Sequence, residues 1–140
     1  MDQATIFAPF LALMLLTLLV WLYMYARRIP FIQHRGLRPQ QITPAELARL
    51  SPPAVSNPSD NLKNLFEVPT LFYPLALYLY ATGHVDATYV AAAWVFVCFR
   101  AAHSAVHCTV NIVLLRFWLY ACSTLALAFM IAKAAYAAFT

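Results

Sequence analysis

The chain has 140 residues, of which 64% are hydrophobic and 10% are charged, and its net charge is +4. A soluble domain has roughly a quarter of its residues charged, so this composition indicates an integral membrane protein. The basic residues gather at the ends of the apolar stretches instead of forming a basic, aromatic-rich surface segment, which argues against a nucleic-acid partner.

The first apolar stretch covers residues 6–25 and is followed directly by Arg27 and Arg28. It is longer than the apolar core of a signal peptide, which has roughly 7 to 15 residues. No site of small residues for signal cleavage follows it, and the preceding residues are acidic instead of basic. We therefore predict a retained membrane-spanning helix.

Residues 26–61 are predicted to be a long polar loop, because they hold six of the nine prolines and half of the charged residues. Within this loop, Thr43 is followed by Pro44 and Glu46, which is the pattern of a helix capping box with proline at the first helical position. The pattern predicts a short helix through Leu50 that ends before the pair Pro52 and Pro53.

Three further apolar stretches cover residues 62–81, 87–107 and 112–138. A bilayer is crossed by about 20 apolar residues, and none of the stretches has the alternating pattern of barrel strands. The connections between them are short, so neighbouring helices are expected to be antiparallel. The predicted fold is an all-α integral membrane protein with one domain over residues 1–140, an antiparallel four-helix transmembrane bundle.

The distribution of Lys and Arg predicts the orientation in the membrane. The first loop and its edges are rich in basic residues, and Arg116 follows the third connection, whereas the N-terminus and the second turn carry only Asp2 and Asp86. Basic loops remain in the cytoplasm. We therefore expect the first loop and the last turn in the cytoplasm and both termini outside it.

The third stretch carries an unusual polar stripe. Arg100, His103 and His107 stand at positions i, i+3 and i+7, which share one face of a helix. Ionisable residues at membrane depth are expensive and usually line a site or contact a partner helix. The stripe is thus the leading candidate for a functional feature.

Three more polar residues are expected at the same depth as the stripe. In the predicted topology, Asn64 and Glu67 begin the second span and share one of its faces, and Arg116 begins the fourth span. Glu67 could simply neutralise Arg100 across the bundle. Arg116 could be an interfacial anchor, which is its most common role, or it could stabilise a developing anion.

The histidines and cysteines also admit several interpretations. His103 and His107 could be interhelical packing residues or could contact a ligand. Their spacing also permits a shared metal, but only Cys108 and Glu67 are near enough to complete a set of three or four ligands, so no metal is predicted. The three cysteines are odd in number and lack C-x-x-C spacing, which excludes a disulfide framework.

Together these residues resemble the MAPEG family, the membrane-associated proteins of eicosanoid and glutathione metabolism. The resemblance lies in the run from Asn64 to Glu67, in Arg100-x-x-His103-x-x-x-His107, and in Arg116 nine residues further on. The four apolar stretches and the long basic first loop match as well. The resemblance covers nearly the whole chain and implies a divergent bacterial member of the inner membrane.

Members of this family are homotrimers with sites between subunits, and many bind glutathione. The resemblance therefore implies a homotrimer with glutathione as co-substrate, in contact with membrane lipids and a lipophilic small molecule. It assigns Arg116 to stabilising the thiolate, and it assigns glutathione contacts to the following residues: Asn64, Glu67, Arg100, His103, His107 and, from the adjacent subunit, Arg28. His107 stands where better-studied members have a tyrosine.

The function implied is a membrane-bound glutathione transferase or peroxidase that acts on a lipophilic substrate. The alternative is an oligomeric membrane bundle that binds a lipid or small ligand without catalysis. Proton or ion transport is a third interpretation of the Glu, His and Arg residues, but four spans without an internal repeat are not typical of a transporter.

Overall fold

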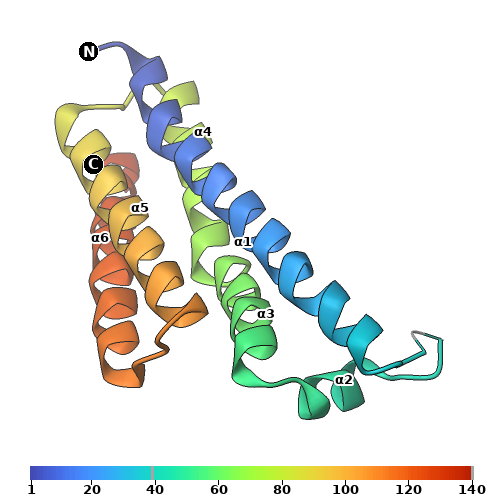
Figure 1. The fold of residues 1–140 in the computed structure, drawn as a ribbon. Helices are drawn as coiled ribbons and strands as arrows, with labels where there is room; N and C mark the ends of the chain where they lie inside the picture. The colour runs from blue at the N-terminus through green and yellow to red at the C-terminus, as the bar shows by residue number, and fades with distance from the viewer. Residues whose placement is uncertain (39, 140) are drawn as a thin grey trace.

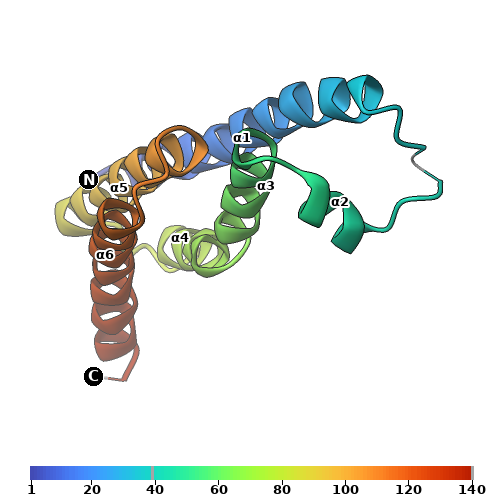
Figure 2. The same ribbon diagram turned by 60° about the horizontal axis from the view of Figure 1, so that its bottom comes forward.

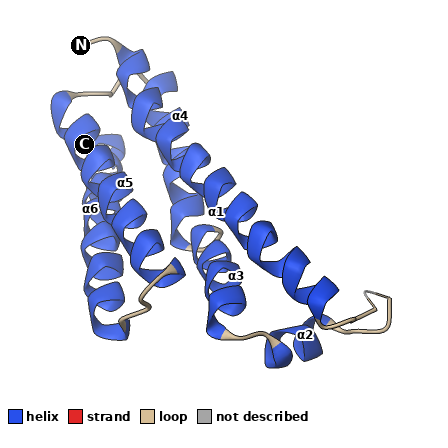
Figure 3. Cartoon of the chain, viewed as in Figure 1, coloured by secondary structure: helices blue, strands red, loops and turns tan. Residues whose placement is uncertain are grey.

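The computed structural model of the chain describes residues 1–38 and 40–139. In this described part the regular structure is helical and contains no strand, as Figure 3 shows. Three helical segments are long and apolar enough to cross a membrane: Gln3–His34, Ala87–Cys108 and Val113–Phe139. The prediction of an all-α protein with membrane-spanning helices is confirmed.

The first helix is longer than the apolar stretch that predicts it. A short 3-10 helix, η1 (Gln3–Ile6), leads into α1 (Phe7–His34), which continues nine residues beyond the predicted end at residue 25. Pro30 lies within its last two turns, where only one helical hydrogen bond is lost. Hydropathy marked where the apolar surface ends, but the helix continues as a polar one.

Residues 26–61 were predicted to be a loop, but most of them are helical, so this prediction is wrong for most of the segment. Residue 39 of the segment lies outside the described residues. The short helix within it is confirmed as α2 (Pro44–Leu50): the Thr43 hydroxyl accepts from the backbone N–H of Glu46, and the Glu46 carboxylate accepts from that of Thr43. Pro52 and Pro53 end α2, but Pro53 also begins α3 (Pro53–Leu65). Proline suits a first helical position because its fixed φ is already helical.

Residues 62–81 do not form the single helix that was predicted. After α3 ends, a 3-10 turn, η2 (Val68–Leu71), leads into α4 (Phe72–Ala81). Pro69 prevents α3 from continuing, because it lacks an N–H to donate to the carbonyl four residues earlier, and it lies instead at the beginning of η2. Glu67, with φ −96° and ψ −113°, lies in the break and not on a helix face.

The last two helices closely match their predictions. They are α5 (Ala87–Cys108) and α6 (Val113–Phe139), joined by a short turn. Figures 1 and 2 show that α1, the α3 and α4 pair, α5 and α6 alternate in direction, with α2 set to one side. The first connection and the α5–α6 turn consequently lie at one end of the molecule, and both termini lie toward the other.

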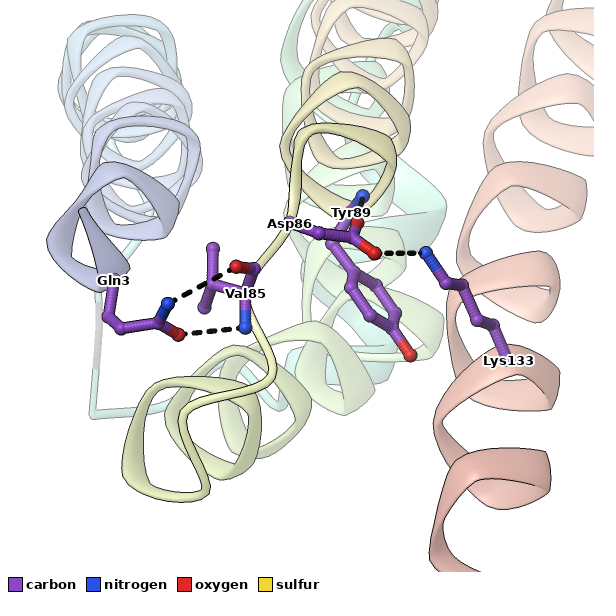
Figure 4. A network of polar contacts seen from close by, with 5 residues as sticks. All are labelled: Gln3, Val85, Asp86, Tyr89 and Lys133. Atoms are coloured by element: carbon purple, nitrogen blue, oxygen red, sulfur yellow. Dashed lines mark hydrogen bonds and ion pairs between the residues drawn. The ribbon is translucent and has the colours of Figure 1, made fainter. Parts of the chain in front are cut away.

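The end that holds the termini is tied together by polar contacts with the α4–α5 turn (Figure 4). The Gln3 side chain makes two hydrogen bonds to the backbone of Val85. Asp86 caps α5 by accepting from the Tyr89 N–H and forms an ion pair with Lys133 of α6, whose ammonium lies 4.2 Å from the centre of the Tyr89 ring. One turn thus holds both η1 and α6.

The buried residues divide the molecule into an apolar and a polar half. The apolar core lies toward the end with the termini, between η1, α1, α4, the first half of α5 and the second half of α6. It consists of Ile6, Leu13, Phe72, Ala76, Leu79, Val85, Tyr89, Ala93, Phe96, Val97, Leu127, Met130 and Ala134. The other half is built on α3, the end of α5 and the start of α6, and there the interior is polar.

Candidate functional site

The polar half of the molecule concentrates side chains that are rarely buried. They come from α3 and from the last three turns of α5, and each is at least nine-tenths buried: Asn57, Asn61, Arg100, His103, Ser104 and His107. Buried polar groups are costly unless they are hydrogen-bonded. So many in one region point to a function beyond packing.

Arg100 is at the centre of this region and is completely buried. Its Nη2 donates to the backbone carbonyl of Asn64 at 3.2 Å, and its guanidinium lies over the ring of Tyr120, 4.4 Å from the ring centre. Within the described residues its Nε and Nη1 have no hydrogen-bond partner. A buried guanidinium with unpaired donors is disfavoured, so this arginine is suited to an anionic ligand.

No direct ion pair joins Arg100 to Glu67 in the described part of the chain, so the expected pairing across the bundle is not formed there. Ion pairs there join Lys63 to Asp60 and Lys133 to Asp86, whereas Glu67 is exposed at the break after α3. The expectation that Asn64 and Glu67 share a helix face is likewise wrong. Both expectations assumed a continuous helix, which Pro69 interrupts.

The two histidines contact each other edge to face, and a hydrogen bond fixes the orientation of His103. His103 Nδ1 is 3.0 Å from the backbone carbonyl of Arg116. Because a carbonyl only accepts, Nδ1 carries the proton, and Nε2 is the acceptor in the neutral ring. The His103 ring is 5.6 Å from the rings of both His107 and Tyr120. His103 thus joins the end of α5 to the start of α6.

Arg116 is held at the first turn of α6. Its Nη1 donates to Oδ1 of Asn111 in the α5–α6 turn at 2.5 Å, and Nδ2 of Asn111 donates to Oδ1 of Asn57 on α3 at 3.1 Å. Asn111 has a positive φ of 48°. The side chain of Arg116 is therefore fixed by residues from two other parts of the fold.

A hollow of about 220 Å³ opens between α3 and α6. It is lined by Asn64, His103, Val113, Arg116, Phe117 and Tyr120. One side is therefore polar and cationic, and the other presents exposed apolar side chains of the α6 surface. Such a site can accept a molecule, or a pair of molecules, with one charged and one lipophilic part.

The structure brings most of the predicted site residues together. Asn64, Arg100, His103, His107 and Arg116 meet at one end of the protomer through the contacts given above.

Arg28 lies elsewhere in the protomer. It donates to the Ser59 hydroxyl at 2.7 Å and lines a separate groove of about 600 Å³ between α1, α2 and α3. The contact that we expect between Arg28 and the ligand of a neighbouring subunit would form only in an oligomer, so it remains a prediction.

The sequence interpretation missed three residues of the site: Tyr120, Asn111 and Asn57. Tyr120 had a signal, since it stands four residues after Arg116 and therefore on the same face of α6. The two asparagines had none, because their contact joins segments 54 residues apart. In the described residues no group of three or more His, Cys, Asp or Glu side chains is placed to hold a metal ion.

Comparison with known proteins identifies the family of the chain. No curated protein and no solved structure matches the chain. The sequence model of the MAPEG family matches residues 6–136, which is nearly the whole chain and includes every residue of the polar site. With its apolar helices long enough to span a membrane, the chain is an integral membrane protein and belongs to the MAPEG family.

Proposed function

We propose that the protein is a membrane-bound enzyme that uses glutathione to conjugate a lipophilic electrophile or to reduce a lipophilic hydroperoxide. The observation that carries the proposal is the buried guanidinium of Arg100, with two nitrogens that lack a partner in the described protomer, beside a hollow lined by Asn64, His103 and Arg116. Glutathione is a peptide with two carboxylates, and guanidinium groups bind carboxylates through paired hydrogen bonds.

In this proposal each polar residue has a distinct role toward glutathione. Arg100 binds a carboxylate, and Asn64, His103 and His107 contact the peptide. Glu67 binds its amino group at the exposed break after α3. The catalytic residue is Arg116, whose guanidinium stabilises the thiolate.

The chemistry follows from ionising the thiol. Arg116 lowers the pKa of the bound thiol by favouring the anion, and the released proton passes to water. The thiolate then attacks a carbon of the electrophile, so that a carbon–sulfur bond forms while the bond to a leaving group breaks. In the peroxidase reaction, two glutathione molecules are oxidised to a disulfide while the hydroperoxide is reduced to an alcohol and water.

We further propose the assembly and the orientation that this reaction needs. The broken segment Pro53–Ala81 forms the fourth crossing of an antiparallel four-helix bundle, and three copies form a homotrimer in which Arg28 reaches the glutathione of a neighbour. The basic first connection and the α5–α6 turn face the cytoplasm, with both termini outside, in a bacterial inner membrane. Glutathione then enters from water, and the lipophilic substrate enters from the bilayer.

A ligand titration of the detergent-purified protein tests the proposal. Glutathione at a hundred times its Kd should stabilise the wild type by about 2.7 kcal/mol. Arg100→Met should abolish this stabilisation, because it removes the buried donors. Arg49→Gln is the matched control, since it removes one positive charge from the exposed helix α2, and it should respond like the wild type.

Turnover separates catalysis from binding alone. Arg116→Ala should reduce turnover about a hundredfold while the protein still binds glutathione and keeps its oligomeric state. No stabilisation of the wild type at millimolar glutathione would contradict the whole proposal. Binding without turnover would instead support the alternative of a non-catalytic ligand-binding protein.

A further inference from the structure

Arg116 is held by a chain of two side-chain amides. Its Nη1 donates to Asn111 Oδ1 at 2.5 Å, and Asn111 Nδ2 donates to Asn57 Oδ1 at 3.1 Å. An amide has one accepting and one donating end. Only one orientation of the Asn111 amide satisfies both neighbours, so each contact fixes the other.

The three residues of this chain come from three parts of the fold. Arg116 lies in the first turn of α6, Asn111 in the turn before it, and Asn57 on α3, where it is 8% exposed. The backbone of Asn111 has a φ of 48°, a conformation that asparagine adopts more readily than most residues with a side chain. The turn thus places an amide where the guanidinium can reach it.

A free arginine at this position would be poorly placed for catalysis. Its side chain has four rotatable bonds and loses about 2 kcal/mol of rotamer entropy when it is ordered. Asn111 binds the guanidinium before any substrate arrives, through one nitrogen, while Arg116 still lines the hollow. Its carbonyl is also held by His103. Both ends of Arg116 are thereby fixed relative to α3 and α5.

We infer that Asn111, supported by Asn57, is a positioning residue that aims the Arg116 guanidinium at the reacting sulfur. The inference rests on the proposed function of Arg116 and adds to it the device that holds this side chain in place. α3 then has two roles in the site: Asn64 lines one wall of the hollow, and Asn57 supports Asn111. We call the hydrogen-bonded chain Asn57–Asn111–Arg116 the relay. Loss of the relay should affect the ionisation of the thiol more than the binding of substrates.

Two variants and one control test the relay. Asn111→Gly removes the amide but keeps the positive φ, which glycine adopts without strain. Asn57→Leu removes the amide that accepts from Asn111 and keeps a side chain of similar size. Thr109→Val is the control, because the Thr109 hydroxyl donates to Ala105 within α5 from the same turn without contacting Arg116.

Three measurements are made on each purified protein. The first is turnover with glutathione and a lipophilic aryl halide, separated into kcat and KM. The second is the pH dependence of kcat/KM, which reports the pKa of the thiol or of its partner. The third is the rate at which phenylglyoxal modifies Arg116, followed by mass spectrometry, which needs no glutathione.

For Asn111→Gly we expect kcat at neutral pH to fall by about tenfold to a hundredfold, with KM changed less than about threefold. The pH profile should move to higher pH, and Arg116 should be modified faster. Asn57→Leu should show the same changes to a smaller extent, and Thr109→Val none of them.

The inference is overturned if Asn111→Gly, or Asn57→Leu where the glycine variant does not fold, keeps the wild-type pH profile and Arg116 reactivity. Failure of the proposed function looks different. In that case the wild type shows no turnover with glutathione, although Arg116 still becomes more reactive in Asn111→Gly. That result would leave the anchoring of Arg116 intact but overturn its role toward a thiolate.

Discussion

The ion pair between Asp86 and Lys133 should contribute measurably to stability. It joins the α4–α5 turn to α6, and its side chains are 49% and 31% exposed. Fully exposed pairs contribute about 0.2 to 1 kcal/mol, and this one is partly shielded and has one favoured geometry, because Asp86 is also fixed as a helix cap. We therefore expect a coupling free energy of about 1 kcal/mol.

A double-mutant cycle with Asp86→Asn and Lys133→Met isolates this term. Asparagine still caps a helix, so Asp86→Asn removes the charge and keeps the cap, whereas Asp86→Ala should cost about 1 kcal/mol more. Lys133→Met also loses the contact with the Tyr89 ring, worth about 0.5 to 1 kcal/mol, but such effects cancel in the cycle. Unfolding free energies in detergent, followed by tryptophan fluorescence, supply the four values.

The matched control is the pair Lys63–Asp60, which joins two positions of α3 and is 70% and 53% exposed. Its cycle should give less than about 0.5 kcal/mol. A coupling for Asp86–Lys133 that does not exceed this control would refute the reasoning, because partial shielding and the fixed carboxylate would then have no effect.

The same pair predicts how stability depends on pH. The hydrogen bond from Lys133 holds the pKa of Asp86 below its usual value, against the opposing effect of burial. The contribution of the pair should therefore be complete above the unfolded pKa of about 4 and disappear as pH falls through the lower folded value. The difference between the wild type and Asp86→Asn should shrink accordingly in acid, and a difference that does not decrease as pH falls below the unfolded pKa would contradict the assignment.

Three further substitutions test other parts of the fold. Thr43→Ala removes the cap of α2 and should speed amide hydrogen exchange in residues 44–50 while leaving α5 and α6 unchanged. Gly83→Ala should lower the unfolding free energy by about 1 kcal/mol, because the φ of 71° is unfavourable for alanine. The added methyl group would meet no neighbour, so the cost comes from the backbone alone, and a neutral result would show that the turn relaxes. Phe96→Ala should lower the unfolding free energy by about 3 to 5 kcal/mol, because the side chain is completely buried beside Phe72.

The fold could be predicted where local signals and hydropathy agree. The beginning of α5 was predicted at Ala87 from the apolar stretch, and the structure begins the helix there, with Asp86 as its cap. The capping box at Thr43 predicted α2, and the structure confirms it. These signals depend on neighbouring residues and need no knowledge of the tertiary structure.

The failures share one physical cause. Hydropathy reports which residues can lie in lipid, and it does not report where a helical hydrogen-bond ladder begins or ends. Residues 26–34 continue α1 with a polar surface, and Pro53 begins α3 inside the predicted loop. In the opposite sense, Pro69 interrupts a stretch that hydropathy treats as uniform.

The site was predicted as a set of residues but not as a set of contacts. The spacing on α5 placed Arg100, His103 and His107 on one face, which the structure confirms by burying all three. Their partners come from other helices, such as Tyr120 beneath the Arg100 guanidinium. A single sequence contains no signal for the distance between two helices, so those pairings required the structure.

The break after α3 has a mechanical consequence for the whole protomer. Helices bend with least cost where the hydrogen-bond ladder is already interrupted, and residues 66–71 form such a joint between two rigid segments. α3 packs against α1 and α5, whereas α4 packs against η1, α1 and α6. A shift of α3 can be absorbed at this joint. Because α3 carries both Asn64 and Asn57, such a shift would move the wall of the hollow together with the side chains that hold Arg116, while the end of the molecule that holds the termini stays still.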